Sequence, residues 1–543
     1  MTFTTSATER DRTNQTGPFS VLVLDRVDPA GLAILGDVAR VDARDAVEPA
    51  ELLRIIGDYD ALMVRSATKV TAEVIEAGSR LKIIGRAGVG VDNIDVGAAT
   101  RRGVIVVNSP EGNTVAAAEH ALAMMFALAR HVAPADGAMK RSEWKRERFT
   151  GTELYNKTLG VFGLGKIGAR VAKVASAVGM RVLGCDPFLT PERAQELGVE
   201  PVDFETLIAT SDFITLHVPK TPETSKLFNA DTLSRCKQGV RLINCARGGI
   251  IDEAALASAI AGGHVAGAAL DVFEVEPLGE SPLRALGEKV VLTPHLGAST
   301  EEAQIKVAVD VAEQIVSVLK GDSARSAVNI PTMRPEVVEP VRPFMGLAEK
   351  LGSFASQLLD GPIERIEILY HGALAGKNVE PLTVAALKGA LSHAVPEGVN
   401  YVNAPVVARD RGVEVRESRS SEAKDYADLI TVSVIGTGVW HTVAGTVFGE
   451  GDARVVRIDA HAFNMAPSGD ILIAPHMDRP GVIGTIGTML GEHGVNIFGF
   501  QLGRKYKQGP AVMALNVDDA IAPDLLGRIS ALEGFHDVRF VRL

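Results

Sequence analysis

A glycine-rich turn between a strand and a helix constrains this chain more than any other feature. Gly163-x-Gly165-x-x-Gly168 follows an apolar run at 158–162 and opens a helical pattern. Glycines at this spacing let the backbone approach the pyrophosphate of a dinucleotide, which the helix N-terminus then stabilises. Asp186 closes the next apolar run, where a carboxylate accepts hydrogen bonds from both ribose hydroxyls and repels a 2′-phosphate. The turn therefore predicts an α/β fold that binds NAD, although Asp186 could instead serve as a turn residue before Pro187.

Short apolar runs alternate with helical stretches through the first 300 or so residues, as they do in parallel α/β sheets. A first unit has runs at 21–24, 61–64, 81–84 and 104–107. An Ala-rich helix at 114–130 leads into a second unit, which has six expected strands at 158–162, 181–185, 213–217, 240–244, 266–270 and 289–293. We expect two Rossmann-like parallel-sheet domains. A helix at 301–319 is long enough to return the chain to the first unit, which would then be discontinuous.

The rest of the chain predicts two smaller domains. A proline-rich segment at 331–343 has the composition of a linker, and the stretch after it mixes helical and alternating patterns, which indicates an α+β domain. The last part has the order βαββαβ, which is typical of a ferredoxin-like domain. We therefore expect a disordered tail at 1–17, a substrate-binding domain at 18–110 and 299–328, an NAD-binding domain at 111–298, an intervening domain at 329–465 and a regulatory domain at 466–543.

Composition narrows the class of protein. A chain of 543 residues is long enough for about three or four domains. Its formal net charge of −11 argues against a nucleic-acid partner, and no apolar run reaches the roughly 20 residues that a membrane span needs. The three cysteines have no metal-binding spacing, so we expect no metal site and a reducing, cytoplasmic location.

Three side chains follow strands of the second unit, at the sheet edge where open α/β folds bind ligands. Arg247 can hold a carboxylate with paired hydrogen bonds, or can form only a surface ion pair. His295 is suited to donate or accept a proton, and Glu276 could keep its imidazole charged, but their spacing does not show that they pair. Asp271 either faces the nicotinamide or simply ends a strand. Together these residues predict hydride transfer involving a 2-hydroxy or 2-oxo acid.

The stretches 163–168, 244–249, 271–277 and 294–300, in this order, resemble the D-isomer-specific 2-hydroxyacid dehydrogenases. Further stretches at 64–70, 85–93 and 108–113 are similar to the branch of that family that acts on 3-phosphoglycerate. This resemblance runs from about residue 19 to the end. It implies oxidation of 3-phosphoglycerate to 3-phosphohydroxypyruvate with NAD, the first step of the phosphorylated route to L-serine, with Arg247, Glu276 and His295 as catalytic residues.

The resemblance also implies the residues that contact each ligand. The cofactor residues would be Val89, Gly163, Gly165, Lys166, Ile167, Gly168, Asp186, Val218, Cys245, Ala246, Arg247, Asp271, His295, Leu296, Gly297 and Ala298. The substrate residues would be Arg65, Ser66, Arg86, Gly88, Asn113 and Arg247.

The C-terminal unit resembles an ACT domain, a small-molecule sensor that pairs between subunits. In related dehydrogenases L-serine binds there, and the matching positions are His476, Asp478 and Asn496. An ACT pair that only dimerises is the alternative. The resemblance implies a homodimer or homotetramer, and the basic run Lys145, Arg146 and Arg148 either reaches a neighbouring active site or is solvated surface.

Two other functions fit the same motifs. The same catalytic residues would serve a hydroxypyruvate or glyoxylate reductase, with 2-oxoglutarate as a further candidate substrate, because only the phosphate site separates these enzymes. A non-catalytic NAD-sensing scaffold would share the dehydrogenase fold, but the ACT-like unit points to amino-acid metabolism.

Overall fold

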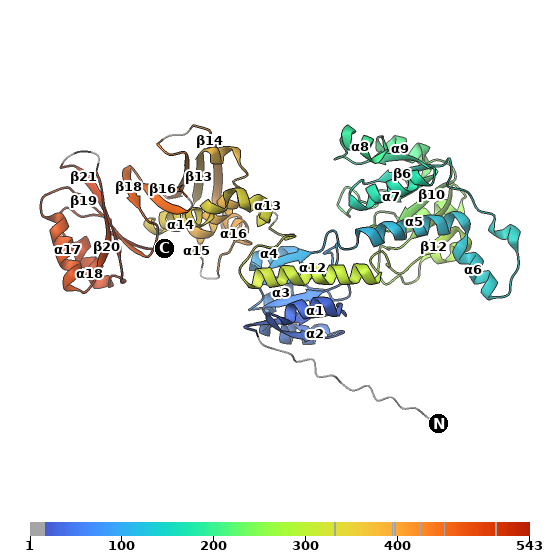
Figure 1. Cartoon of the computed structure of the whole chain (residues 1–543), viewed down its shortest axis with the longest axis horizontal. Coiled ribbons are helices and arrows are strands. Elements are labelled where there is room, and N and C mark those ends of the chain that lie inside the picture. Colours follow the sequence, from blue (N-terminus) through green and yellow to red (C-terminus); the bar gives the residue numbers. More distant parts are fainter. Residues whose placement is uncertain are drawn as a thin grey trace, which may run out of the picture.

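The computed structural model describes residues 17–543 except 331–332, 394, 396–397, 423–424, 450, 505 and 507, so nearly all of the tail expected at 1–17 lies outside the described residues. Four sheets organise the chain, and each belongs to a separate group of consecutive elements (Figure 1). Two are parallel, one is mixed and one is antiparallel. The expected α/β class, with an α+β domain and a ferredoxin-like domain behind it, is confirmed.

The first sheet is parallel and has the order β2-β1-β3-β4-β5. Its strands are β1 (Phe19–Val23), β2 (Ala39–Ala43), β3 (Ala61–Val64), β4 (Ile83–Arg86) and β5 (Ile105–Asn108). Its helices are α1 (Pro29–Gly36), α2 (Pro49–Ile55), α3 (Ala72–Ala77) and α4 (Val96–Arg102). Helix α12 (Glu301–Leu319) also packs on this sheet, where Val307, Val311 and Ile315 share a core with Val21 and Ile83. The chain therefore leaves the first unit and returns to it.

The second sheet is parallel, has seven strands and follows the order β12-β11-β10-β9-β6-β7-β8. Its strands are β6 (Thr158–Phe162), β7 (Arg181–Cys185), β8 (Glu200–Pro201), β9 (Phe213–Leu216), β10 (Val240–Asn244), β11 (Val265–Leu270) and β12 (Val290–Leu292). Its helices are α5 (Thr114–Arg130), α6 (Val132–Lys140), α7 (Lys166–Ala177), α8 (Pro191–Leu197), α9 (Phe204–Thr210), α10 (Ala230–Arg235) and α11 (Glu253–Ala261). Strand order reverses between β6 and β9, which places a ligand crevice beside the glycine turn.

The third sheet is mixed and has the order β14-β13-β15-β16-β17-β18. Its strands are β13 (Arg365–Gly372), β14 (Glu414–Ser420), β15 (Asp428–Gly436), β16 (Val439–Phe448), β17 (Asp452–Ile458) and β18 (His461–Met465), and its helices are α13 (Pro335–Val338), α14 (Arg342–Leu358), α15 (Glu380–Ser392) and α16 (Ala404–Asp410). The segment at 331–343, which has the composition of a linker, contains the starts of two helices, α13 and α14. Pro335 and Pro343 lie in the first turns of these helices, where a missing N–H costs nothing.

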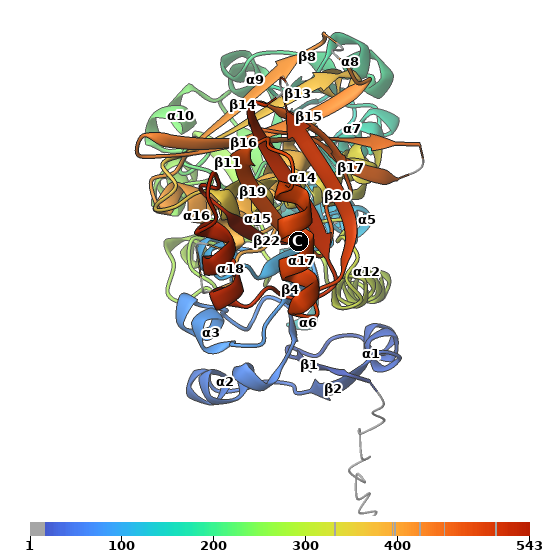
Figure 2. The same ribbon diagram turned by 90° about the vertical axis from the view of Figure 1, so that its left-hand side faces the viewer.

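The fourth sheet is antiparallel and has the order β20-β21-β19-β22, the ferredoxin-like arrangement. Its elements are β19 (Asp470–Met477), α17 (Val482–Glu492), β20 (Ile497–Arg504), β21 (Pro510–Val517), α18 (Pro523–Ser530) and β22 (Arg539–Arg542). Helices α17 and α18 cover its outer face (Figure 2). The inner face joins the core of the third unit through Ile471, Val512 and Val541.

Specific polar contacts join the units. Gln357 of α14 exchanges two hydrogen bonds of 2.9 Å with the backbone of Arg542 at the sheet edge. Asn400 donates to the carbonyl of Gly103, at the end of α4, over 2.8 Å. Within the described residues, no helix is both long and apolar enough to cross a membrane.

Candidate active site

The glycine turn between β6 and α7 is shaped for a phosphate. Gly163 has a φ of +92°, and a Cβ there would lie 2.6 Å from the carbonyl oxygen of His217. Beside Gly165, by contrast, no atom lies within 4 Å of the Cβ position. The turn therefore leaves open space at the N-terminus of α7, whose first N–H groups have no partner within the helix. These residues fit the pyrophosphate of a dinucleotide, with Lys166 and Ile167 at the helix start.

Asp186 lies at the end of β7, beside this turn. Its Oδ2 accepts a hydrogen bond of 2.7 Å from the N–H of Leu164, inside the turn, and its Oδ1 accepts one of 2.8 Å from the N–H of Phe188. The carboxylate therefore stabilises both the backbone of the glycine turn and the turn that follows β7. Each oxygen keeps a lone pair for a ribose hydroxyl, so the structural role and the expected ribose role are compatible.

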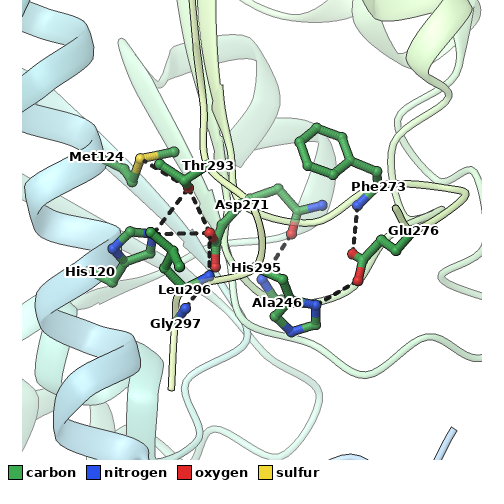
Figure 3. A network of polar contacts seen from close by, with 11 residues as sticks. His120, Met124, Ala246, Asp271, Phe273, Glu276, Thr293, His295, Leu296 and Gly297 are labelled. Carbon is green, nitrogen blue, oxygen red and sulfur yellow. Dashed lines mark hydrogen bonds and ion pairs between the residues drawn. The ribbon is translucent and has the colours of Figure 1, made fainter. Parts of the chain in front are cut away.

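Asp271 is fully buried after β11 and receives an unusual number of hydrogen bonds (Figure 3). Its Oδ1 accepts from the hydroxyl of Thr293 at 2.6 Å and from the N–H of Leu296 at 2.8 Å, and its Oδ2 accepts from the N–H of Gly297 at 2.8 Å. His120 Nε2 lies 3.1 Å from Oδ1. Burial acts to raise the Asp271 pKa, but these donors, His120 foremost, outweigh it and hold the pKa below its ordinary value.

His295 and Glu276, which the sequence could not pair, are in contact. His295 Nδ1 lies 2.7 Å from Glu276 Oε2, so Nδ1 donates and Nε2 is the nitrogen left for a substrate (Figure 3). The other carboxylate oxygen of Glu276 accepts from the N–H of Phe273 at 3.0 Å. The hydrogen bond to Glu276 raises the pKa of His295 against the opposing effect of burial. The contact fixes the tautomer of the imidazole, which suits it to act as a base.

The loop that carries Arg247 packs tightly against the loop that carries Glu276. A Cβ at Gly248 would lie 1.7 Å from the carbonyl oxygen of Phe273, so only glycine permits this backbone approach. Asn244 closes the turn from the other side: its Oδ1 accepts from the N–H of Ala246 at 3.0 Å, and its Nδ2 donates to the carbonyl of Arg247 at 2.9 Å. The positions of Arg247 and Glu276 are therefore set by one shared backbone arrangement.

The Arg247 side chain reaches from the second unit to the first. Its Nε lies 3.2 Å from Oδ2 of Asp92, on the loop that follows β4. Arg86 also lies there; burial first, and then repulsion from Arg247 and Arg65, lowers its pKa to about 10. Arg86 therefore stays charged at neutral pH, and its buried Nε has no hydrogen-bond partner. Concentrated, incompletely paired positive charge at this place favours an anionic ligand.

The other expected substrate residues come from the first unit and from the chain segment that crosses to the second unit. Arg65 lines a small cavity together with Arg26, Ala87 and Gln304, while the neighbouring Ser66 is exposed. Asn113, just before α5, has a buried Oδ1 with no hydrogen-bond partner, and Gly88 lies in the turn after β4. No hydrogen bond or ion pair joins these residues to one another within the described part of the chain.

Most of the remaining cofactor candidates lie at one edge of the second sheet. Val218, Cys245 and Ala246 follow β9 and β10, and Leu296, Gly297 and Ala298 follow β12, all at the carboxyl edge of the second sheet. Val89 belongs to the first unit, and its carbonyl accepts from Asn108 Nδ2 at 2.5 Å. Lys166 forms an ion pair with Glu111, on the chain crossing between the units.

The expected effector residues have other partners in this structure. His476 is buried, stacks on Phe535 at 5.2 Å between ring centroids and contacts the carbonyl of Ala474 at 2.9 Å. Asp478 pairs with Arg504, and Asn496 donates to Asp518 at 2.6 Å. In the basic run, Arg146 begins a short 3-10 helix (Arg146–Phe149), Arg148 pairs with Glu143 and Glu288, and Trp144 before it is 75% exposed.

Sequence inspection missed two residues of the site. His120 lies within the Ala-rich helix α5, and Thr293 lies next to the quoted 294–300 stretch. The sequence signal for His120 was a histidine within a mostly apolar helical stretch, near Ala116, Ala117 and Met124, which the structure shows to be buried.

Family models match three parts of the chain. Residues 122–297 match the NAD-binding domain of D-isomer-specific 2-hydroxyacid dehydrogenases. Residues 340–459 match the intervening domain of D-3-phosphoglycerate dehydrogenase, and residues 476–534 match the ACT domain.

Relatives match nearly the full length of the chain. A D-3-phosphoglycerate dehydrogenase of Synechocystis is 53% identical over 524 residues, covering 96% of this chain and 94% of its own. One of Archaeoglobus fulgidus is 46% identical over 506 residues, covering 93% and 96%. A solved D-lactate dehydrogenase of Escherichia coli has a TM-score of 0.52 and 29% identity, and it covers 57% of this chain and 99% of its own.

Proposed function

The chain belongs to the D-isomer-specific 2-hydroxyacid dehydrogenases, in the form named D-3-phosphoglycerate dehydrogenase, and we propose that Arg247, Glu276 and His295 perform its reaction. The enzyme is an NAD-dependent dehydrogenase that oxidises 3-phosphoglycerate to 3-phosphohydroxypyruvate, the entry to serine biosynthesis. The 2.7 Å contact between His295 and Glu276, beside the guanidinium of Arg247, is the observation that carries the assignment of roles.

We infer that neutral His295 removes the hydroxyl proton of the substrate at Nε2. Glu276 is hydrogen-bonded to Nδ1 and stabilises the imidazolium that forms, as an acceptor carboxylate does for a catalytic histidine. In the reverse direction the imidazolium returns this proton to the carbonyl oxygen. The acceptor for the hydride of the substrate carbon would be supplied by NAD, when bound. The glycine turn, Asp186 and the residues after β9, β10 and β12 would hold it.

In this proposal Arg65, Arg86 and Arg247 together bind the negatively charged groups of the substrate. Arg247 lies on the catalytic loop and would hold the carboxylate or the reacting oxygen through its planar pair of N–H groups. Arg65, in the first unit, would bind the phosphate, with Arg86 between them. The exposed Asp92 that now pairs with Arg247 forms only a weak ion pair, which an incoming carboxylate can replace.

The assay that tests this function follows NADH formation with 3-phosphoglycerate while the keto product is trapped. We expect turnover with 3-phosphoglycerate and much less with D-lactate or D-glycerate, because neither carries a phosphate for Arg65. Preferred reduction of glyoxylate or hydroxypyruvate would instead favour the reductase alternative. A protein that binds NAD but turns over none of these acids would fit a sensing scaffold.

We propose further that the C-terminal domain binds L-serine as an effector. Support comes from the ACT domain at 476–534 and from the hydrogen-bonding groups of Asp478 and Asn496. Calorimetric titration of the full-length protein with L-serine should give saturable binding, with D-serine as the control. Asp478→Asn should weaken this binding without changing turnover. Absence of any heat with L-serine would leave the ACT domain with a dimerising role only.

A cytoplasmic homodimer or homotetramer is also part of the proposal. The oligomer is supported by the ACT domain, because ACT domains pair between subunits. The cytoplasmic location is supported by the three cysteines, which form no disulfide, as expected in a reducing compartment. Reduction of 2-oxoglutarate is a side activity that the same assay can measure.

A further inference from the structure

His120 contacts Asp271, which in turn binds the backbone of His295. It lies on helix α5, which carries none of the expected cofactor or substrate residues. Helix α5 packs over β10, β11 and β12 of the second sheet, and the imidazole of His120 lies against Asp271 and Thr293, which follow β11 and β12 (Figure 3). Its Nε2 is 3.1 Å from Asp271 Oδ1 and 3.2 Å from Thr293 Oγ1. Thr293 donates its own proton to Asp271, so His120 is the donor in both of its contacts.

Asp271 in turn holds the backbone that carries His295. Three consecutive N–H groups end on this one residue: that of His295 donates to its carbonyl at 2.9 Å, and those of Leu296 and Gly297 donate to its carboxylate. His295 has a φ of +56°, in the left-handed region that is unfavourable for a residue other than glycine. The conformation of the catalytic histidine therefore depends on bonds to Asp271.

A fully buried carboxylate needs strong donors to remain ionised. Among the described residues, His120 is the only side chain able to carry a positive charge that contacts Asp271. It is itself largely buried, with 18% of its side chain exposed. Without this donor the buried carboxylate would take up a proton more readily, and a protonated Asp271 is a weaker acceptor for the N–H groups of Leu296 and Gly297.

We propose that His120 is a positioning residue for the reaction: through Asp271 it fixes the 295–297 backbone and so orients His295 toward the substrate. The inference rests on the role proposed above for His295. His120 touches neither substrate nor cofactor in this scheme. Its contribution is the N–H at Nε2, and any side chain that places an N–H at that point should replace it.

Two amide variants test this requirement. In His120→Gln the amide nitrogen can reach the place of Nε2, whereas in His120→Asn it stops about one bond short and leaves Asp271 without that donor. We expect His120→Gln to keep kcat within about threefold of the original, and His120→Asn to lose about tenfold or more in kcat, because one hydrogen bond to a charged group is removed. The KM for 3-phosphoglycerate should change little in both.

Hydrogen exchange gives a readout that does not require activity. Amides of 295–297 should exchange about tenfold faster in His120→Asn than in His120→Gln or the unmodified protein. Glu119→Gln, on the exposed face of the same helix, should match the unmodified protein in both measurements. Equal exchange and equal kcat in the two amide variants would overturn the proposal. If the unmodified protein does not oxidise 3-phosphoglycerate, the proposed function fails, but the exchange comparison still decides the role of His120.

Discussion

Replacing His295 with alanine is expected to lower kcat for 3-phosphoglycerate oxidation by about 10²- to 10⁴-fold, the usual contribution of a positioned general base. Affinity for NAD should stay within about threefold, because the backbone of the 295–297 stretch is held by Asp271 and not by the imidazole. Stopped-flow turnover and fluorescence titration with NADH measure the two quantities separately. Unchanged kcat would remove His295 from the proton-transfer step.

Glu276→Gln supplies the companion test, because it retains the shape of the pair and removes its charge. Glu276 raises the His295 pKa, and the proposed mechanism of oxidation requires neutral His295, so the rate of oxidation should increase with pH through a pKa above the ordinary histidine value. Without the carboxylate the His295 pKa falls, and the acid limb of the kcat/KM profile should move to lower pH. An unmoved limb would show that another group controls it.

The fold was largely predictable because most strands of the two parallel sheets are short apolar runs buried on both faces. Residues 158–162 and 181–185 were assigned to their observed bounds for this reason. β2 and β14 were missed because neither edge strand has a continuous apolar run: β14 is mostly polar and exposed, and the five residues of β2 include Arg40 and Asp42. β8 was missed because it has only two residues. With β8, the second sheet has seven strands and not the expected six.

From the sequence, only the grouping of the site residues at one edge of the sheet could be predicted. Parallel strands bring their carboxyl ends to one edge, so Arg247, Glu276 and His295 could be expected near each other. Their contacts depend on the neighbouring positions of β11 and β12 and on the backbone approach of Gly248 to Phe273, which no spacing reveals. His120 contacts Asp271 and Thr293 because helix α5 packs against the second sheet, although His120 precedes both residues by more than 150 positions in the chain. Such contacts arise from tertiary structure alone.

The Arg247 guanidinium offers the second large effect. Arg247→Ala removes up to two charge-assisted hydrogen bonds to the substrate, each contributing about 1.5–3 kcal/mol, so kcat/KM for 3-phosphoglycerate should fall by about 10²- to 10⁴-fold. Steady-state kinetics at saturating NAD measure this loss. Arg247→Lys keeps the charge without the planar pair of donors and should recover only part of the loss.

Chemical rescue separates a missing guanidinium from a disturbed loop. Because the neighbouring turn is held by Asn244 and by the Gly248 approach to Phe273, removing the side chain should leave a vacant space of the right shape. Added guanidinium ion should therefore restore part of the activity of Arg247→Ala in a saturable manner. Arg235→Ala, which removes an exposed arginine on α10 of the same unit, should show neither the loss nor the rescue. Full activity of Arg247→Ala without guanidinium would exclude Arg247 from substrate binding, and a loss that guanidinium cannot repair would assign it to the structure of the loop.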